Sequence, residues 1–476
     1  MSLTHALKWS FLSELASKAI SPIVFVVLAR LLTPEDFGVM SSALMVMSFS
    51  QIFWEAGIGK ALIQRQTDND EAANVAFWIN MGLGIVIAFV LFVSAQSIAM
   101  TFFHDDRVTA VIQVMTIQVF LGAVSSVHTA LLQKEMGFKK LFWVRFATVS
   151  FPGMASIPLA WNGMGYWALV VGTLIGQAAQ VIMLWKMSTW RPKFSFKIHV
   201  AKELTQFGAW VGVYGLLAWF YVWADSLIVG MYLGSHDLGL YRTGNQVAIM
   251  IYTIMFGPIT PVLYSYIVRM SNDKEKLRDA FMKVIKMLTF ISIPVGMIMF
   301  SLSEPLANVL FGAKWSGIGF VIGIMSLMHG FSCVVGMNGE FYRAIGKPSY
   351  ETIATASALI VYLGAYLYSI QIGFELFVWT RLCLAICALI LHVLVAHKIF
   401  SISIWSIISY VLLISFVSAI VLYILQYIVI NTVTGSLVQF VVGGLLSVVC
   451  LGFLLYNIEK NGILSVLVLM IKKRYI

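Results

Sequence analysis

The stretch KWSFLSELASKAISPIVFVVLARLLTPEDFG, residues 8–38, decides the fold. Its first part is a run of about 25 mostly apolar residues, which as a helix rising about 1.5 Å per residue is long enough to cross a bilayer. Glu14 and Lys18 interrupt this run one helical turn apart, so they share a face, and charges inside a membrane usually face a cavity. Thr33 followed by Pro34 and two acidic residues favours the start of a second helix. The stretch therefore predicts a membrane span with a polar face, a capped turn and a second helix.

The whole chain has the composition of a membrane protein. Of its 476 residues, 60% are hydrophobic and 11% are charged, whereas soluble globular proteins carry roughly 25% charged residues. No stretch is long enough for a separate soluble domain. The charges in the first span and the lack of a small-residue cleavage motif argue against a signal peptide, so we expect the first helix to be retained. The four cysteines lie in apolar segments and predict neither a disulfide framework nor a metal site.

Apolar runs separated by short polar breaks predict an all-α integral membrane protein with about fourteen transmembrane helices. The predicted spans are 8–32, 38–59, 75–103, 108–132, 141–161, 165–186, 205–232, 238–268, 281–302, 316–342, 350–371, 374–397, 403–428 and 436–457. They divide the chain into an N-terminal six-helix bundle (1–187), a basic cytoplasmic linker (188–204), a C-terminal six-helix bundle (205–398), two extra helices (399–458) and an amphipathic basic cytoplasmic tail (459–476).

The distribution of lysine and arginine predicts the orientation of these spans. With the N-terminus in the cytoplasm, 23 of these residues fall in inner segments and tails and 4 fall in outer segments. Cytoplasmic loops carry an excess of positive charge, and a wrong helix count would have scrambled this asymmetry. Both termini are therefore expected in the cytoplasm. Orientation also explains the net charge of +10, so nucleic acid is not needed as a partner.

An internal repeat relates two of the predicted hairpins. A shift of 201 residues aligns LLTPEDFGVM with YLGSHDLGLY, so that Asp36 matches Asp237 and Gly38 matches Gly239. The two hairpins fall at equivalent places in two six-span units, and an even number of spans per unit makes the repeats parallel. We therefore assign Thr33, Pro34 and these four residues to a structural turn of the duplicated scaffold.

Several ionisable residues lie inside the predicted spans, where charge is costly and usually functional. The predicted substrate-cavity residues are Glu14, Lys18, Arg145, Asp225, Glu340, Arg343 and Arg381. For Arg145 and Arg343, which lie near helix ends, structural pairing is an equally open interpretation. Glu14 and Asp225 have no charged counterpart under the repeat shift, as expected for groups that serve an asymmetric substrate. Lys18, Arg145 and Arg343 lie in the inner half of the membrane, where they are suited to receive an anionic headgroup.

The chain lacks the motifs of several other functions. It contains no G-x-x-x-x-G-K-[ST] phosphate loop, no cluster with metal-ligand spacing and no nucleophile–base arrangement. We therefore expect no cofactor and no catalytic residue. Any active transport would draw on an ion gradient or on the gradient of the substrate.

Four segments carry a family resemblance: LARLLTPEDFG (Leu28–Gly38), DSLIVG (Asp225–Gly230), LGLY (Leu238–Tyr241) and FYRAIGKPS (Phe341–Ser349). With them, nearly the whole chain resembles the polysaccharide (O-antigen or exopolysaccharide) flippases of the Wzx type. These flippases belong to the MOP superfamily, which also contains the MATE exporters.

The resemblance implies a fold, a function and a location. The fold would be two six-helix bundles in a MATE-like V, with two C-terminal helices added. The function would be transfer of an undecaprenyl-pyrophosphate-linked oligosaccharide from the cytoplasmic to the periplasmic leaflet of the bacterial inner membrane. Membrane lipids, a polysaccharide polymerase and a chain-length regulator would be its partners. Family members are thought to use proton or sodium gradients, and Glu14 and Asp225 are the candidates for ion coupling here.

Two other functions stay open at this stage. A MATE-type cation or drug antiporter is the main alternative, although its site is usually more acidic and aromatic than the mixed, basic set predicted here. A membrane glycosyltransferase or polymerase is the second alternative, but these enzymes usually need a sizeable outer loop, and the outer loops of this chain are short.

Overall fold

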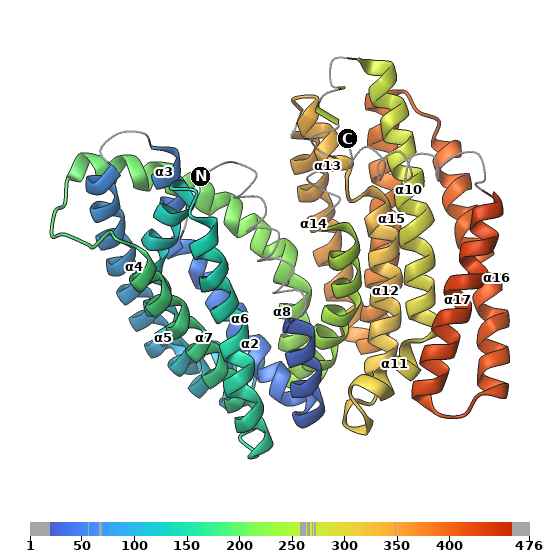
Figure 1. Cartoon of the computed structure of the whole chain (residues 1–476), viewed down its shortest axis with the longest axis horizontal. Helices are drawn as coiled ribbons and strands as arrows, with labels where there is room; N and C mark the ends of the chain where they lie inside the picture. The colour runs from blue at the N-terminus through green and yellow to red at the C-terminus, as the bar shows by residue number, and fades with distance from the viewer. Residues whose placement is uncertain are drawn as a thin grey trace. The chain divides into compact units, whose positions relative to one another are not determined.

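The computed structural model describes residues 20–458 except 56, 66–68, 258–262, 264–266, 269, 271–272 and 348 (Figure 1). The described residues form helices joined by turns and short loops, which confirms the predicted all-α class. Two compact units are present, Met1–Gly239 and Leu240–Ile476.

The first unit begins in the described part of the chain with the helix Ile20–Leu31. It continues with α2 (Pro34–Glu55), α3 (Ile58–Gln64), α4 (Asn69–Ile98), η1 (Ala99–Phe103), α5 (Asp106–Lys134), α6 (Phe138–Trp161), α7 (Tyr166–Met187) and the first part of α8 (Ile198–Phe256). Buried apolar side chains of α2, α4 and α5, among them Met45, Leu91 and Met115, form its largest core.

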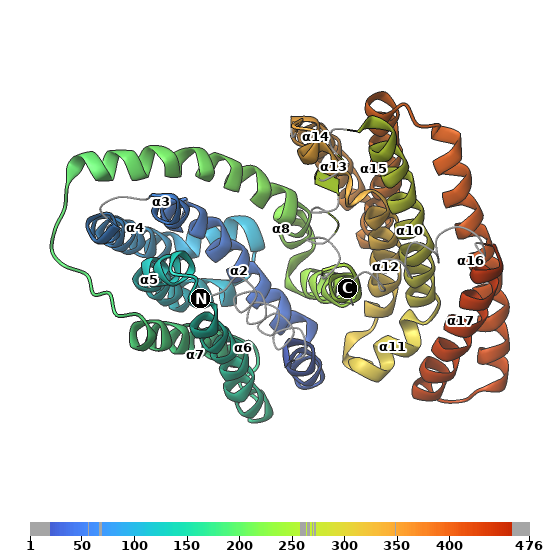
Figure 2. The ribbon, with the colours of Figure 1, turned by 45° about the horizontal axis from the view of Figure 1, so that its top comes forward.

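The run α8 consists of two helices that meet at a kink at Gly234, which falls in the predicted break between the spans 205–232 and 238–268. Gly234 has φ 82° and ψ −172°, a backbone conformation that is essentially restricted to glycine. A helix can therefore continue on both sides of a sharp bend without an intervening loop. Figure 2 shows the part of α8 before the bend running across α4, α3 and α2 of the same unit. Val211, for example, lies close enough to Gly57 that an added Cβ would be 2.7 Å from its Cβ.

The second unit begins with the end of α8. It contains α10 (Lys274–Ser301), α11 (Ser303–Leu310), η2 (Ala313–Trp315), α12 (Ile318–Val335), α13 (Asn338–Ala344), α14 (Ser349–Ile372), α15 (Phe374–Phe400), α16 (Ile404–Thr432) and α17 (Ser436–Ile458). Its core includes an aromatic cluster of Phe281, Phe341 and Phe400. Two details differ from the sequence prediction: α11 occupies a predicted break, and the predicted span 316–342 is divided into α12 and α13 at Gly336.

Within the described residues, eleven helices are long and apolar enough to cross a membrane. Helix α6 has 24 residues but is not among these eleven, and it carries Arg145, Pro152 and Pro158 in its interior. The short helix Ile20–Leu31 is also apolar. The multi-span membrane class is thus confirmed, and the number of fourteen spans remains a prediction.

Candidate functional site

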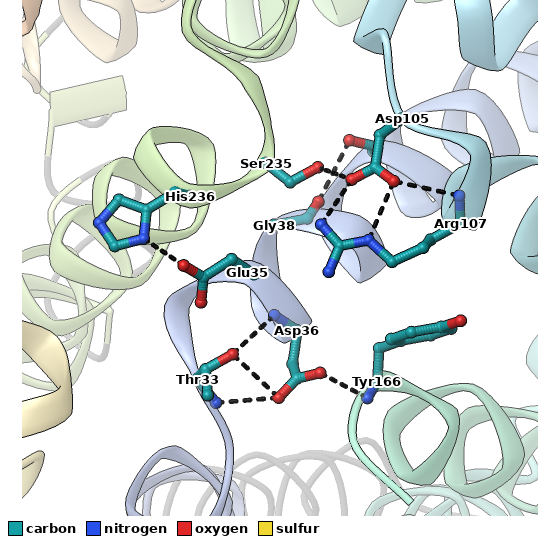
Figure 3. A network of polar contacts seen from close by, with 10 residues as sticks. Thr33, Glu35, Asp36, Gly38, Asp105, Arg107, Tyr166, Ser235 and His236 are labelled. Carbon is teal, nitrogen blue, oxygen red and sulfur yellow. Dashed lines mark hydrogen bonds and ion pairs between the residues drawn. The ribbon is translucent and has the colours of Figure 1, made fainter.

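The turn before α2 is held by a reciprocal pair of hydrogen bonds. The Thr33 N–H donates to Asp36 Oδ2 at 2.9 Å, and the Asp36 N–H donates to Thr33 Oγ1 at 3.4 Å (Figure 3). Asp36 Oδ1 accepts a third hydrogen bond, at 2.8 Å, from the backbone N–H of Tyr166 at the start of α7. This arrangement is a capping box with Asp in the position of the usual Glu. The cap therefore also joins α2 to α7.

The two hairpins of the repeat pack directly against each other inside the first unit. A Cβ built on Gly38 would lie 1.7 Å from the carbonyl oxygen of Ser235, and one built on Gly239 would lie 1.8 Å from that of Pro34. The two contacts are exchanged by the 201-residue shift, because Pro34 corresponds to Ser235 and Gly38 to Gly239. The residues that define the repeat in the sequence thus meet as a symmetric pair, where glycine is required for the close backbone approach. Asp237, the counterpart of Asp36, lies half-buried beside them.

The same symmetry pairs Glu35 with His236, whose positions also differ by 201 residues. Glu35 Oε1 lies 2.6 Å from His236 Nδ1, and both side chains are partly exposed (Figure 3). Asp105, in the turn between η1 and α5, completes the network. Its Oδ2 accepts hydrogen bonds from Ser235 Oγ at 2.6 Å and from Arg107 Nη2 at 2.8 Å. Burial by itself raises the pKa of Asp105, but the hydrogen bonds from Arg107 and Ser235 outweigh it and hold the pKa below its usual value.

A polar cavity of about 610 Å³ lies in the first unit, between α2, α3, α4, α5, α7 and the first part of α8. Its polar lining consists of carboxamides, hydroxyls and one amine: Ser48, Gln51, Lys60, Asn80, Ser125, Ser126, Thr129, Gln133, Gln177 and Gln180. Glycines of α3, α5 and α8 also line the cavity and leave it open. A volume in this range accommodates a small organic ligand.

Two smaller cavities share lining residues with the main cavity. One, of about 260 Å³, shares Thr129, Gln133 and Gln180 with it and is lined in addition by Arg145 of α6. The other, of about 230 Å³, shares Gln51 and Gln177 and adds Gln118. The positive charges of Lys60 and Arg145 are therefore part of a lining that is otherwise uncharged. No carboxylate is among the residues that line these three cavities.

Of the predicted cavity residues in the first unit, Arg145 lies on a described cavity and Asp225 is in α8. The Asp225 side chain is 4% exposed, and its Oδ1 accepts a hydrogen bond from the Ser226 N–H at 2.6 Å. Glu14 and Lys18 lie outside the described residues.

The predicted residues of the second unit are engaged with neighbouring side chains. Arg343 forms ion pairs at 2.6 Å with both Glu340 and Glu351. The Arg381 guanidinium donates a hydrogen bond to the Tyr366 hydroxyl and lies 5.6 Å from the centre of the Tyr366 ring. These contacts are compatible with structural pairing, and a role of the three residues in a substrate cavity remains a prediction.

The carboxamides of the cavity were not predicted from the sequence. Glutamine costs less than a charge inside a membrane, so a single glutamine in an apolar span does not by itself indicate a polar cavity. One signal was available: Gln177 and Gln180 are three residues apart in an otherwise apolar helix and therefore share a face. A paired amide on one face of a span is a sign of a polar cavity.

Comparison with known proteins gives matches to one family and one fold. The family described as "Polysaccharide biosynthesis protein" matches residues 27–319. The succinoglycan biosynthesis transport protein ExoT of Rhizobium meliloti is 26% identical over 347 residues, which cover 72% of this chain and 70% of that protein. The inward closed structure of the lipid II flippase MurJ superposes with a TM-score of 0.72 at 12% identity, over 95% of this chain and 99% of that one. An inward-facing MATE multidrug transporter gives a TM-score of 0.62 at 14% identity, over 81% and 94%.

Proposed function

Because this chain belongs to the polysaccharide biosynthesis protein family, we propose that it is a flippase for a lipid-linked glycan. Its substrate would be an oligosaccharide repeat unit on undecaprenyl pyrophosphate, moved from the cytoplasmic to the periplasmic leaflet by alternating access. The relative ExoT is named as a transport protein of polysaccharide biosynthesis, and the MurJ-like fold belongs to a membrane transporter. Both support transport rather than glycan synthesis.

The observation that carries this proposal is the lining of the cavity in the first unit. Lys60 and Arg145 provide positive charge for a pyrophosphate, and the lining around them offers hydrogen bonds without opposing charge. The antiporter alternative requires an acidic site for its cationic substrate, and these cavities have no carboxylate in their lining. A phosphate-bearing, hydroxyl-rich substrate matches this combination better than a cation.

The sequence supplies the rest of the proposed architecture. It supports about fourteen spans, with bundles at 1–187 and 205–398, extra helices at 399–458 and both termini in the cytoplasm. Glu14, Lys18, Asp225, Glu340, Arg343 and Arg381 stay candidate cavity residues beside Arg145. Glu14 and Asp225 are the proposed ion-coupling groups, and a polymerase and a chain-length regulator are the proposed partners in the inner membrane.

The experiment is complementation of a deletion strain by full-length variants. We expect Arg145→Ala, Lys60→Ala and Lys18→Ala each to lower export of the glycan about tenfold or more, since each removes a charge-assisted contact. Cytoplasm-facing lipid-linked repeat units should accumulate, while the amount of protein in the membrane stays unchanged. Lys140→Ala, which removes an exposed charge from the same α6 as Arg145, is the matched control and should export normally. Normal export by Arg145→Ala and Lys60→Ala would show that this cavity does not receive the carrier.

A further inference from the structure

The charge of the lining residues differs between the main cavity of the first unit and the two smaller cavities that adjoin it. Gln180 lines both the main cavity and the smaller one that contains Arg145, whereas Gln177 lines the main cavity and the one that contains Gln118. Arg145 lines the first of these smaller cavities and Lys60 lines the main cavity, whereas the cavity that contains Gln118 has no charged lining residue. A ligand that spans these cavities needs an anionic group at one end and neutral polar groups at the other.

The uncharged region is built for hydroxyl and acetamido groups. A carboxamide offers both a donor and an acceptor, and a sugar hydroxyl can pair with either. Gln51, Gln177 and Asn80 come from α2, α7 and α4, so they surround the cavity rather than forming a single row. A carboxylate of the ligand would meet no cation among the lining residues of the cavity that contains Gln118.

Several buried polar atoms of this region have no hydrogen-bond partner among the described residues. They are Trp54 Nε1, Asn80 Oδ1 and Gln118 Oε1. Trp54 is 6% exposed and Asn80 is 1% exposed, although both line the main cavity. A buried polar atom without a partner is costly, and native proteins usually satisfy it. These three atoms are enclosed by protein, so a ligand in the cavity would reach them only after the side chain of Trp54, Asn80 or Gln118 changes rotamer.

We infer that the part of this cavity lined by Gln177 and Gln118 is a subsite for an uncharged sugar of the glycan, a hexose or N-acetylhexosamine, with the adjoining pyrophosphate at Lys60 and Arg145. The inference rests on the proposed function and adds the chemical class of the sugar that the lining residues recognise. At about 610 Å³ the main cavity is large enough for one or two sugar rings. Gln177 and Gln180 would then determine which glycan is accepted, and Arg145 would bind any undecaprenyl pyrophosphate carrier regardless of its sugar.

The test measures binding of two probes to the full-length protein in lipid nanodiscs. One probe is undecaprenyl pyrophosphate, and the other is the same carrier with an uncharged disaccharide. We expect Gln177→Leu and Gln180→Leu to weaken binding of the glycosylated probe about tenfold, the effect of one or two lost hydrogen bonds, and to leave binding of the bare carrier within about twofold. Arg145→Ala should weaken binding of both probes. Gln96→Leu is the matched control, because Gln96 is an exposed carboxamide of α4 and lines none of these cavities.

The outcomes separate this inference from the proposed function. If the two glutamine variants lost binding of both probes equally, or lost binding of neither, the inference of a sugar subsite would be wrong. The protein would still be a flippase that binds the carrier. If the unmodified protein bound neither probe, the proposed function would fail and the subsite with it. Gln177→Glu repeats the test in a side chain of the same shape, which keeps the acceptor but lacks the amide donor when ionised. It should show the same selective loss, and a protein that bound both probes normally would contradict the subsite.

Discussion

At the scale of single residues, Asp105 links the start of α5 to the second hairpin of the repeat. It accepts hydrogen bonds from Arg107 on its own turn and from Ser235 on α8. A carboxylate whose pKa is lowered in the folded state stabilises the fold above its unfolded pKa of about 3.9. The stabilisation is lost as the pH falls through the folded value.

We therefore predict that Asp105→Asn lowers the free energy of unfolding by roughly 1 kcal/mol at neutral pH, a modest value because the site is partly exposed. The difference from the unmodified protein should shrink as the pH falls below about 4, because the unfolded carboxyl is protonated first and the folded one, with its lowered pKa, only at more acidic pH. Thermal unfolding followed across this range provides the measurement. Asp106→Asn, at the exposed neighbouring position, should show no such dependence. A difference that stayed constant with pH would rule out ionisation of Asp105 as its source.

Single residues also show how far the sequence could predict the candidate site. Arg145 was found because an intramembrane charge is conspicuous, and it does line a cavity. The sequence could not show that Arg343 is paired with Glu351, since Glu351 follows a turn whose path depends on the fold. Gln177 and Gln180 were missed because a glutamine in an apolar helix carries little signal until its neighbours in space are known.

At the scale of elements, the contact between α2 and α8 depends on two glycines more than on its ion pair. Glu35 and His236 are 37% and 48% exposed, and ion pairs of this kind contribute about 1 kcal/mol or less. An added methyl group at Gly38 or Gly239, by contrast, would overlap a backbone carbonyl that cannot rotate away. Backbone proximity is therefore the dominant feature of this contact.

We predict that Gly38→Ala and Gly239→Ala each destabilise the protein by about 1–3 kcal/mol or more, as overpacking does in other cores. Glu35→Gln should cost less than about 1 kcal/mol. Gly82→Ala is the control, since Gly82 lies inside α4 with no atom near the added Cβ, and it should be neutral or stabilise by about 0.5–1 kcal/mol. Thermal unfolding of the purified variants decides among these values. A Gly38→Ala protein as stable as the parent would mean that the two hairpins do not pack this closely.

The helices also show how much of the fold can be predicted from the sequence. Hydrophobic runs located the long helices well, because burial in lipid requires apolar length whatever the surroundings. The same method placed a break between 232 and 238, and the two helices of α8 meet there at Gly234 without an intervening loop. Glycine signals that a chain can turn, but it does not show whether the helix resumes immediately.

At the scale of the whole molecule, the strongest remaining prediction concerns orientation. It depends on the 23 against 4 distribution of lysine and arginine, which is a property of the entire sequence and of no single site. The loop after α7 is one of the lysine- and arginine-rich segments that are predicted to lie in the cytoplasm. The turn between α6 and α7 is one of the segments predicted to lie on the other side. The two therefore lie on opposite sides of the membrane if α7 is a span, as its length of 22 residues and its mean hydropathy of 1.7 indicate.

We predict that Phe196→Cys, after α7, is labelled by a membrane-impermeant maleimide only once spheroplasts are permeabilised, and that Met164→Cys, before α7, is labelled in intact spheroplasts. Both positions are accessible, with exposed fractions of 53% and 42%, so a lack of labelling would reflect the membrane rather than burial. The background is a variant in which the four native cysteines are serines. The reverse pattern would invert the proposed direction of transport, because Lys60 and Arg145 would then receive the pyrophosphate from the periplasmic leaflet. Equal labelling of both positions in intact spheroplasts would remove α7 from the membrane-spanning helices.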